Sequence, residues 1–287
     1  MTVSDRISIF EIASAPDAPA HAVADCAVFP EAAPRGRRLL MLLGAAGVGI
    51  LAAGAAHLAG GAPQGTRAAL GAGILAGGLL STWSPCGYSS LSLLRPVGRP
   101  TARARLAFLP TLAMHALGYA LGAGILGGGL GLAGGLLGFS GAGFWSVLAL
   151  ALAALLYGAH QFDFLRVPYP QRRAQVPHDA RNRFSMETVG LLYGFSLGLN
   201  YLTYVQTPIL YLVTALAFVS GDPATGMLIF AIFNLGRFLP MLANLTAASD
   251  MRIQMWLARR QESAAMLDGA ILVSGGAAAL CGLLAFA

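Results

Sequence analysis

Seven long apolar runs divide the chain, separated by polar stretches that are either rich in arginine or nearly uncharged. About 20 apolar residues are needed for a helix to cross the hydrocarbon core of a bilayer. The pattern therefore predicts an all-α fold, a polytopic bundle of about seven transmembrane helices. The runs cover residues 39–60, 68–94, 106–134, 143–160, 188–219, 225–246 and 267–286.

Some of these runs leave room for irregular structure. The runs 106–134 and 188–219 are longer than one span needs, so each either tilts or carries a re-entrant or broken segment. The first run, 39–60, follows a long polar tail and is longer than the core of a signal peptide. We therefore interpret it as an uncleaved helix. The alternative is a cleaved signal, because Arg37-Arg38 faintly resembles a twin-arginine motif.

The composition favours a membrane location. Of the 287 residues, 56% are hydrophobic and 10% are charged, whereas soluble domains carry roughly 25% charged residues. The 37 glycines suit closely packed membrane helices, because small residues let two backbones approach. The net charge of +6 comes from arginine alone, since the chain has no lysine. The arginines cluster in loops between apolar runs, which indicates topology signals and argues against nucleic-acid binding.

Arginine-rich and arginine-poor loops alternate along the chain. Because arginine-rich loops stay in the cytoplasm, we expect a bacterial inner-membrane protein with a cytoplasmic N-terminus and a periplasmic C-terminus. An odd number of spans satisfies this arrangement. The arginine-rich segments hold Arg35, Arg37 and Arg38 in the tail, Arg95, Arg99, Arg103 and Arg105 before the third run, Arg166, Arg172, Arg173, Arg181 and Arg183 in the 161–187 loop, and Arg252, Arg259 and Arg260 before the last run.

Two halves of the chain resemble each other. In each, a glycine-rich run turns polar and meets a proline, and a later run carries Leu-Gly after a polar residue: His115-Ala-Leu-Gly118 and Asn234-Leu-Gly236. Three spans per half place the halves in opposite orientations, as in inverted repeats whose working site lies near the midplane. The predicted organisation is a flexible cytoplasmic tail (1–38), an extra N-terminal helix (39–61), a first three-helix repeat (66–160), a cytoplasmic loop (161–187) and a second three-helix repeat (188–287).

Polar residues interrupt the first half at membrane depth, where each is a candidate for function because burial in lipid is costly. Around Ser84, Pro85 and Cys86 the proline removes a backbone hydrogen bond, so freed carbonyls and hydroxyls would line a cavity. Cys86 would serve as a redox thiol, or else as a small apolar residue in the interior. His115 is a candidate base that would tune this thiol, with a structural histidine as the alternative.

The second half has a matching polar, proline-broken stretch without a cysteine. Asn234 and Arg237 lie three residues apart, on one face of a later helix. We expect no carboxylate at a similar depth, so Arg237 would bind an anionic substrate or carbonyls freed at a proline. Hydrogen bonding between helices is the alternative for the amide side chains. The candidate cavity residues of this half are Asn200, Thr203, Gln206, Thr207, Pro208, Asn234 and Arg237.

The sequence gives no indication of a metal site, a cofactor or a familiar catalytic motif. Cys26, Cys86 and Cys281 are far apart and form no C-x-x-C pair, which argues against a disulfide framework and a zinc site. The chain contains no H-E-x-x-H, G-x-S-x-G or P-loop motif. We therefore expect no metal and no cofactor. A non-enzymatic role is favoured over an enzyme, apart from redox chemistry at a single thiol.

The chain resembles the DsbD/CcdA family of membrane thiol-electron carriers, in the LysE-like superfamily. The features that carry this resemblance are the Pro85-Cys86 helix, the inverted halves, the cytoplasmic middle loop and the proline-broken second repeat. The resemblance covers roughly residues 66–287. It implies one cysteine beside a proline in each half, and a pair that passes reducing equivalents from cytoplasmic thioredoxin to periplasmic thiols. Cys86 matches the first position. The second falls near Thr203 or Tyr204, where no cysteine stands, so a single thiol would form mixed disulfides with a partner.

The chain is also similar to a membrane-protein family of the bacterial methylamine-utilisation cluster. The points of similarity are the arginine-rich tail, the seven runs, and the blocks STWSPCGYSSLSLLRP and LNYLTYVQTPILYLVTALAF. This resemblance implies a role in making or exporting periplasmic methylamine dehydrogenase, whose disulfide-rich small subunit suits a thiol-handling membrane partner. The expected partners are the dehydrogenase subunits, a thioredoxin-like protein and the lipid bilayer. The alternatives are a transporter of a small anionic or sulfur-containing solute, and a structural scaffold of a membrane complex.

Overall fold

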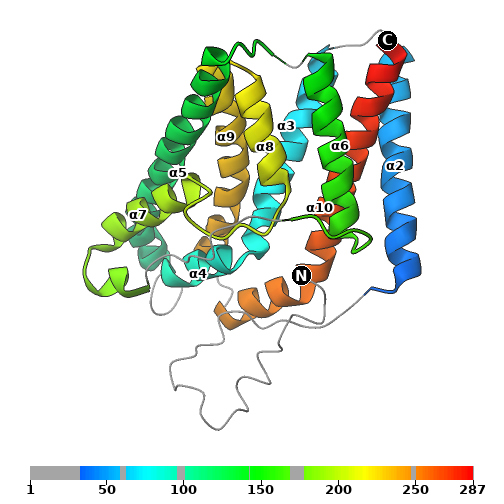
Figure 1. The fold of residues 1–287 in the computed structure, drawn as a ribbon. Helices are drawn as coiled ribbons and strands as arrows, with labels where there is room; N and C mark the ends of the chain where they lie inside the picture. Colours follow the sequence, from blue (N-terminus) through cyan, green and yellow to red (C-terminus); the bar gives the residue numbers. More distant parts are fainter. Residues whose placement is uncertain are drawn as a thin grey trace.

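The computed structural model describes residues 33–58, 63–95, 101–141, 143–168, 178–246 and 250–286. Within these residues the chain forms a helical bundle without strands, which confirms the predicted all-α fold (Figure 1). The helices are α2 (Arg35–Leu58), α3 (Pro63–Leu80), α4 (Pro85–Leu93), α5 (Ala102–Leu136), α6 (Phe144–Gln161), α7 (Met186–Gly198), α8 (Ile209–Val219), α9 (Pro223–Phe238) and α10 (Asp250–Phe286). Short 3-10 helices form η2 (Ser81–Trp83), η3 (His178–Asn182) and η4 (Leu239–Leu245).

Five helices in the described part of the chain are long and apolar enough to cross a membrane: α2, α5, α6, α9 together with η4, and α10. The expected number of seven is not confirmed, because two of the apolar runs are divided into shorter helices. The run 68–94 is split into α3 and α4, and the run 188–219 is split into α7 and α8. Proline and polar side chains withdraw backbone groups from the helical ladder at both breaks. By contrast, the long run 106–134 is one continuous helix, α5.

The outer surface of the bundle is apolar, as a bilayer environment requires. Leu40 and Leu51 on α2 are 73% and 74% exposed, and Leu136 and Trp145 at the ends of α5 and α6 are 79% and 77% exposed. Soluble monomers rarely expose large contiguous apolar surfaces. Lipid tails, in contrast, cover such side chains at no cost while the helices satisfy their own backbone groups.

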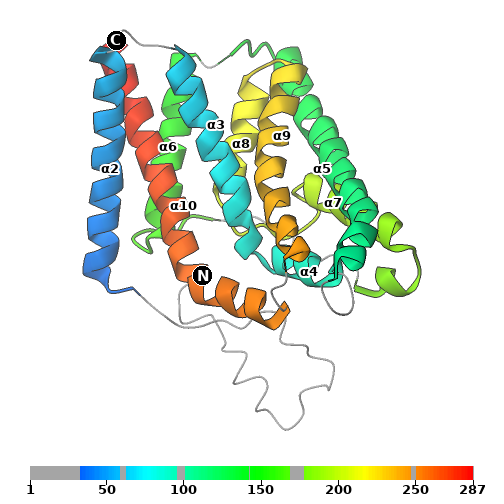
Figure 2. The ribbon, with the colours of Figure 1, turned by 180° about the vertical axis from the view of Figure 1, so that it is seen from behind.

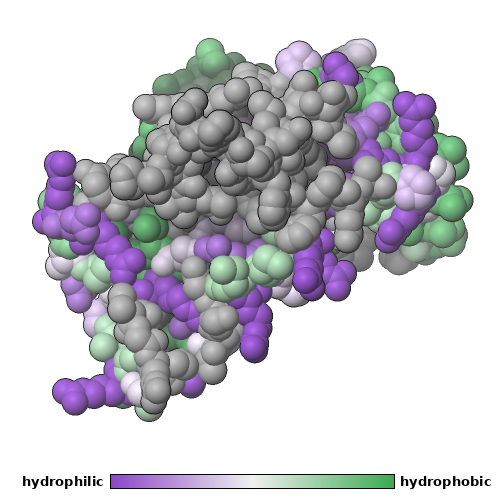
Figure 3. Space-filling model, turned by 90° about the horizontal axis from the view of Figure 1, so that it is seen from below, coloured by the Kyte–Doolittle hydropathy of each residue, from purple (hydrophilic) through white to green (hydrophobic). Residues whose placement is uncertain are grey.

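The described parts of the arginine-rich segments lie at one end of the bundle. Figure 1 places the starts of α2, α5 and α10 and the end of α6 at the lower end, and the turns from α5 to α6 and from α8 to α9 at the upper end. Seen from below, hydrophilic side chains cover much of the described surface of this end (Figure 3). The alternation of loop charge along the chain thus corresponds to two ends of one bundle. Assignment of the lower end to the cytoplasm stays a prediction.

An ion-pair cluster lies at the lower end of the bundle, at the start of α2. α2 begins at Arg35, one turn before residue 39, where the first apolar run begins. Arg38 is only 8% exposed. Its guanidinium donates to Glu262 Oε1 at 2.8 Å and also to the Asp163 carboxylate. These ion pairs join α2 to α10 and to the turn after α6.

Glycines bring α5 close to α7 and α9. At Gly118 on α5, an added Cβ would lie 2.5 Å from Phe195 N on α7. Gly127 on α5 and Gly226 on α9 face each other, each close to the other's carbonyl. Small residues at such contacts are the usual means by which membrane helices approach closely. The result is a central layer in which the backbones of α5, α7 and α9 enclose a few polar side chains.

Matching helices of the two predicted halves run in opposite directions. In Figures 1 and 2, α3 descends, α5 rises and α6 descends, whereas α8 rises, α9 descends and α10 rises. α2 packs against α10 at the edge of the bundle, outside both sets. These directions are the ones that an inverted repeat requires. The repeat and its domain boundaries nevertheless stay predictions, since direction alone does not define them.

Candidate functional site

The break between α3 and α4 is built from hydroxyl side chains and a proline. Ser81 Oγ donates to Gly78 O at 2.6 Å, and Ser84 Oγ donates to Ser81 O at 2.6 Å. Ser84 has an extended backbone and Pro85 begins α4, which suits proline because the first helical position needs no N–H donor. The interruption expected around Ser84 and Pro85 is therefore present, and it places η2 between the two helices.

The break between α7 and α8 carries polar groups into the bundle. α7 ends at Gly198, and Asn200 follows with a φ of 57°, in the left-handed region that asparagine adopts more readily than most residues. The chain is then irregular as far as Pro208, which directly precedes α8. The polar side chains of this segment are buried or half-buried: Thr203, Gln206 and Thr207.

A buried hydrogen-bond network joins this break to α9. Arg237 Nη1 donates to Asn200 Oδ1 at 2.7 Å and to Leu197 O at 2.8 Å. Asn200 Nδ2 donates to Asn234 Oδ1 at 3.1 Å, and Asn234 Nδ2 donates to Gly198 O at 3.0 Å. The three side chains are at most 5% exposed. The guanidinium therefore binds a carbonyl freed at the end of α7, whereas the sequence suggested carbonyls beside a proline.

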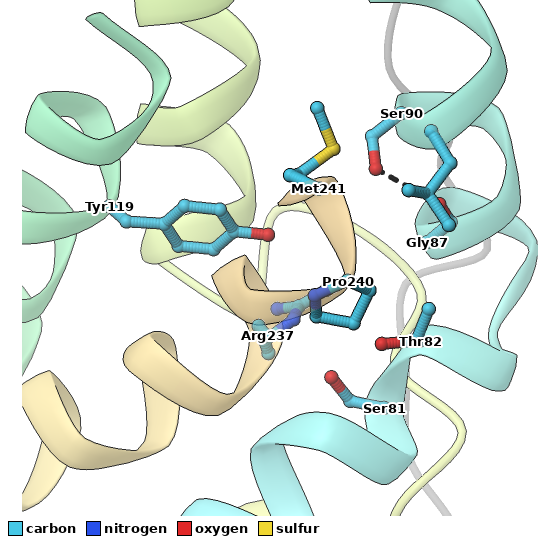
Figure 4. A pocket seen from close by; sticks show the side chains of 9 residues that line it. Ser81, Thr82, Gly87, Ser90, Tyr119, Arg237, Pro240 and Met241 are labelled. Atoms are coloured by element: carbon cyan, nitrogen blue, oxygen red, sulfur yellow. Dashed lines mark hydrogen bonds between the residues drawn. The ribbon is translucent and has the colours of Figure 1, made fainter. Parts of the chain in front are cut away.

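A small cavity, here called the arginine cavity, lies beside this network. Figure 4 shows Arg237 and Pro240 facing Ser81 and Thr82 across it, with the hydroxyl end of Tyr119 directed toward it. Its volume is about 10 Å³, which is room for about one water molecule. The buried hydroxyl of Thr82 finds no hydrogen-bond partner among the described residues. The cavity thus combines a positive charge with hydroxyl groups, the lining that suits a small anion or a polar solute.

His115 is fully buried on α5 and does not line the arginine cavity. Its Nδ1 lies 2.9 Å from Gly190 O on α7, and its ring packs edge-on against Tyr119 with centroids 5.0 Å apart. Its Nε2 has no hydrogen-bond partner among the described residues. The contacts that the structure shows hold α5 against α7, which is the role of a structural histidine. The role of base for Cys86 stays a prediction.

The described structure includes only part of the proposed thiol chemistry. The side chains of Pro85 and Cys86, and the whole of Cys26, lie outside the described residues. The backbone places Cys86 in the first turn of α4, next to Gly87, which lines the arginine cavity. Cys281 lies near the C-terminal end of α10, at the opposite end of the bundle from α4 (Figure 1). A disulfide needs Cα atoms within about 7 Å, so Cys281 does not replace the missing second-half cysteine.

A second cavity, here called the aspartate cavity, lies on the other side of η2. Leu80 and Trp83 line it, whereas the intervening Ser81 and Thr82 line the arginine cavity. Asp268 of α10 closes the second cavity, which has a volume of about 20 Å³. Residues Leu80–Trp83 therefore separate a cavity with a guanidinium from a cavity with a carboxylate.

Asp268 is a carboxylate in the interior of the bundle, and it was not among the candidate site residues predicted from the sequence. It is 2% exposed, accepts a hydrogen bond from Gln161 Nε2 at 2.7 Å, and accepts another from Thr207 Oγ1. Its burial could not be predicted from the hydropathy pattern, because the last apolar run begins at residue 267 and so puts Asp268 at a membrane surface. α10 instead begins at Asp250. The available signal was a single acidic residue flanked on both sides by apolar and small residues.

The predicted site residues therefore divide between two places. Asn200, Asn234 and Arg237 form the network beside the arginine cavity, while Gln206 and Thr207 line the aspartate cavity. Thr203 is buried outside both cavities, and Pro208 precedes α8. In the described part of the chain, no group of three or more metal-binding side chains occurs.

This fold and these cavities define a multi-pass helical membrane protein with charged groups in its interior. No family model and no solved structure matches the chain. Relatives named methylamine utilization protein MauF match it over nearly its full length, and the chain belongs to this family. The relative from Methylorubrum extorquens is 59% identical over 260 residues, 90% of each chain. The relative from Paracoccus denitrificans is 59% identical over 256 residues, 89% of this chain and 91% of the relative.

A more distant member confirms the breadth of the match. The MauF protein of Methylobacillus flagellatus is 52% identical over 259 residues, which is 90% of this chain and 91% of the relative. The resemblance to a methylamine-utilisation family expected from the sequence blocks is therefore confirmed. None of the comparisons shows the resemblance to the DsbD/CcdA carriers.

Proposed function

We propose that the protein is an inner-membrane accessory protein of methylamine utilisation, which assists the maturation or export of periplasmic methylamine dehydrogenase. The observation that carries this proposal is its similarity, over about 90% of the chain, to relatives named for methylamine utilization. The apolar outer surface and the charged interior support a role within the bilayer. The arginine-rich lower end would face the cytoplasm, and the upper end would face the compartment of the dehydrogenase.

Thiol exchange at Cys86 is the finer part of the proposal. Its position in the first turn of α4 supports this chemistry, because the N-terminal end of a helix attracts negative charge and hence favours a thiolate. The Cys86 thiolate attacks a disulfide of a partner protein that reaches the lower end of the bundle, forms a mixed disulfide and releases the other sulfur as a thiol. The dithiol of a thioredoxin-like partner then reduces the mixed disulfide, becomes a disulfide itself and restores the Cys86 thiol.

Deletion of the gene tests the accessory role. We expect the periplasm of the deletion strain to contain little methylamine dehydrogenase, or subunits with incorrect disulfides, when they are separated on non-reducing gels. Normal amounts of correctly oxidised and active enzyme would contradict the proposal. Complementation then tests the thiol: Cys86→Ser should fail to restore the enzyme, whereas Cys281→Ser, at the opposite end of the bundle, should restore it. Full restoration by Cys86→Ser would remove the thiol step and leave the accessory role.

Transport is the second candidate, and the arginine cavity is the observation that favours it. A guanidinium and hydroxyl groups face a small space beside the break between α3 and α4, and the guanidinium is hydrogen-bonded to Asn200 of the other break. Many transporters bind their solutes at such broken helices. Vesicles that contain the protein should then take up a small anionic or sulfur-containing solute, and Arg237→Ala should abolish the uptake. Absence of flux for every such solute would count against transport. Copurification with the dehydrogenase subunits without any effect of Cys86→Ser or Arg237→Ala would indicate a scaffold.

A further inference from the structure

The aspartate cavity is lined by four parts of the chain that are distant in sequence. η2, the end of α6, the segment between α7 and α8, and the middle of α10 each contribute to its lining. Its volume of about 20 Å³ exceeds the roughly 10–15 Å³ that one water molecule requires. The cavity therefore accommodates a group slightly larger than water.

Among the described residues, the carboxylate of Asp268 has neutral hydrogen-bond partners only. Gln161 Nε2 and Thr207 Oγ1 donate hydrogen bonds to its two oxygens. The ion pairs formed between described residues both involve Arg38, at the lower end of the bundle. A carboxylate that is taken out of water without a positive partner is strongly destabilised. When it is ionised, Asp268 therefore needs a positive partner, and the cavity in front of it is the space available for a cation.

The rest of the lining has the chemistry of an ammonium site. Gln206 and Gln261 carry amide oxygens that accept hydrogen bonds from N–H donors, and Asp268 supplies the opposite charge. Trp83 also lines the cavity, and the face of an indole ring attracts a cation. Leu80, Ala264 and Ala265 add apolar surface that suits a short alkyl group.

From this combination, we propose that the aspartate cavity binds a small primary ammonium cation, of the size of ammonium or methylammonium. The N–H groups of the cation donate to Asp268 and to the glutamine oxygens, and a methyl group contacts the apolar part of the lining. A quaternary ammonium ion is excluded, because it is larger and has no N–H donor. The guanidinium of Arg237, beyond η2, repels a cation and so confines it to the aspartate cavity. Binding here does not depend on the maturation role proposed above.

The binding test uses the purified full-length protein in detergent. Tryptophan fluorescence or calorimetry is recorded during titration with methylammonium chloride, ammonium chloride, tetramethylammonium chloride and sodium chloride at constant ionic strength. We expect saturable binding of methylammonium, weaker or equal binding of ammonium, and none of tetramethylammonium. Asp268→Asn should weaken methylammonium binding by about tenfold or more, because a hydrogen bond to a charged group contributes more than the free energy that corresponds to a factor of ten.

Asp222→Asn is the matched control, because it makes the same chemical change at an exposed residue of the upper turn. It should bind methylammonium as the wild-type protein does. If Asp268→Asn does not elute as a single folded species, Gln206→Leu and Gln261→Leu replace it, and each should weaken binding. Absence of saturable binding by the wild-type protein would overturn the proposal, as would unchanged affinity in Asp268→Asn or in both glutamine variants. Each of these results is independent of the dehydrogenase assays, so failure here leaves the accessory role standing.

Discussion

Replacement of Gly118 by alanine is expected to push α5 away from α7. The new Cβ would lie 2.5 Å from Phe195 N and 2.8 Å from the carbonyl carbon of Gly194. Both neighbours are backbone atoms, which cannot rotate aside. Normal contact therefore requires the two helices to separate by about 0.5–1 Å. A gap of about that size loses roughly a quarter to a half of the van der Waals attraction between the separated atoms. Overpacked positions cost typically about 1–3 kcal/mol, against a gain of about 1 kcal/mol in helix propensity. Because the clash is with backbone atoms, we place the cost at the upper end of this range, about 3 kcal/mol, which leaves a net destabilisation of about 2 kcal/mol.

Gly129→Ala is the control on the same helix, since a Cβ at that position meets nothing within 4 Å. It should leave the stability unchanged or raise it by up to about 1 kcal/mol, because only helix propensity changes. The assay is the thermal loss of the helical circular-dichroism signal of the three proteins in one detergent. Gly118→Ala should melt several degrees below the wild-type protein. Equal melting of Gly118→Ala and the wild-type protein, or an equal fall in Gly129→Ala, would refute the reasoning.

Three further substitutions test the polar contacts. Arg237→Met should lower the free energy of unfolding by about 2–4 kcal/mol, because it leaves buried acceptors without a charged donor; a melting temperature equal to that of the wild-type protein would contradict this. Arg38→Met should destabilise more than Arg37→Met, because only Arg38 is buried in ion pairs, and equal melting temperatures would contradict the cluster. Hydrogen bonds from the side chain and backbone of Thr225 lower the pKa of the Asp222 carboxyl. Its stabilising contribution is therefore present above the pKa of the unfolded chain and lost as the pH falls through the folded-state pKa. Asp222→Ala and acid should both speed amide exchange at the start of α9, and unchanged exchange would count against the cap.

Local sequence signals account for the parts of the fold that could be predicted. The helix break at Ser84 and Pro85 followed from a proline and hydroxyls within an apolar run, and the second break followed from the polar, proline-containing stretch within the run 188–219. Length alone was not a guide, because the long run 106–134 forms one continuous helix. The predicted count of seven spans is not confirmed, for a related reason. Hydropathy registers an apolar stretch whether or not the backbone remains helical, so a broken helix and a continuous one give the same pattern.

Contacts between distant segments account for what could not be predicted. Arg37 and Arg38 are adjacent arginines with the same local surroundings, yet only Arg38 reaches Asp163 and Glu262, which come from other parts of the chain. Asp268 is another example, because its burial depends on where α10 begins and on which segments pack beside it. The sequence likewise indicated Arg237 and the two asparagines as candidates, but their common network depends on the close approach of α7 and α9.

Growth on methylamine tests most directly the central claim that the charged interior of this membrane protein serves methylamine utilisation. A deletion strain is complemented with the wild-type gene or with Arg237→Met, and membrane levels of the two proteins are matched by blotting. The account predicts that the wild-type gene restores growth on methylamine and that Arg237→Met does not, while all strains grow equally on a carbon source that bypasses methylamine dehydrogenase. Unimpaired growth of the deletion strain on methylamine, or full rescue by Arg237→Met, would contradict it.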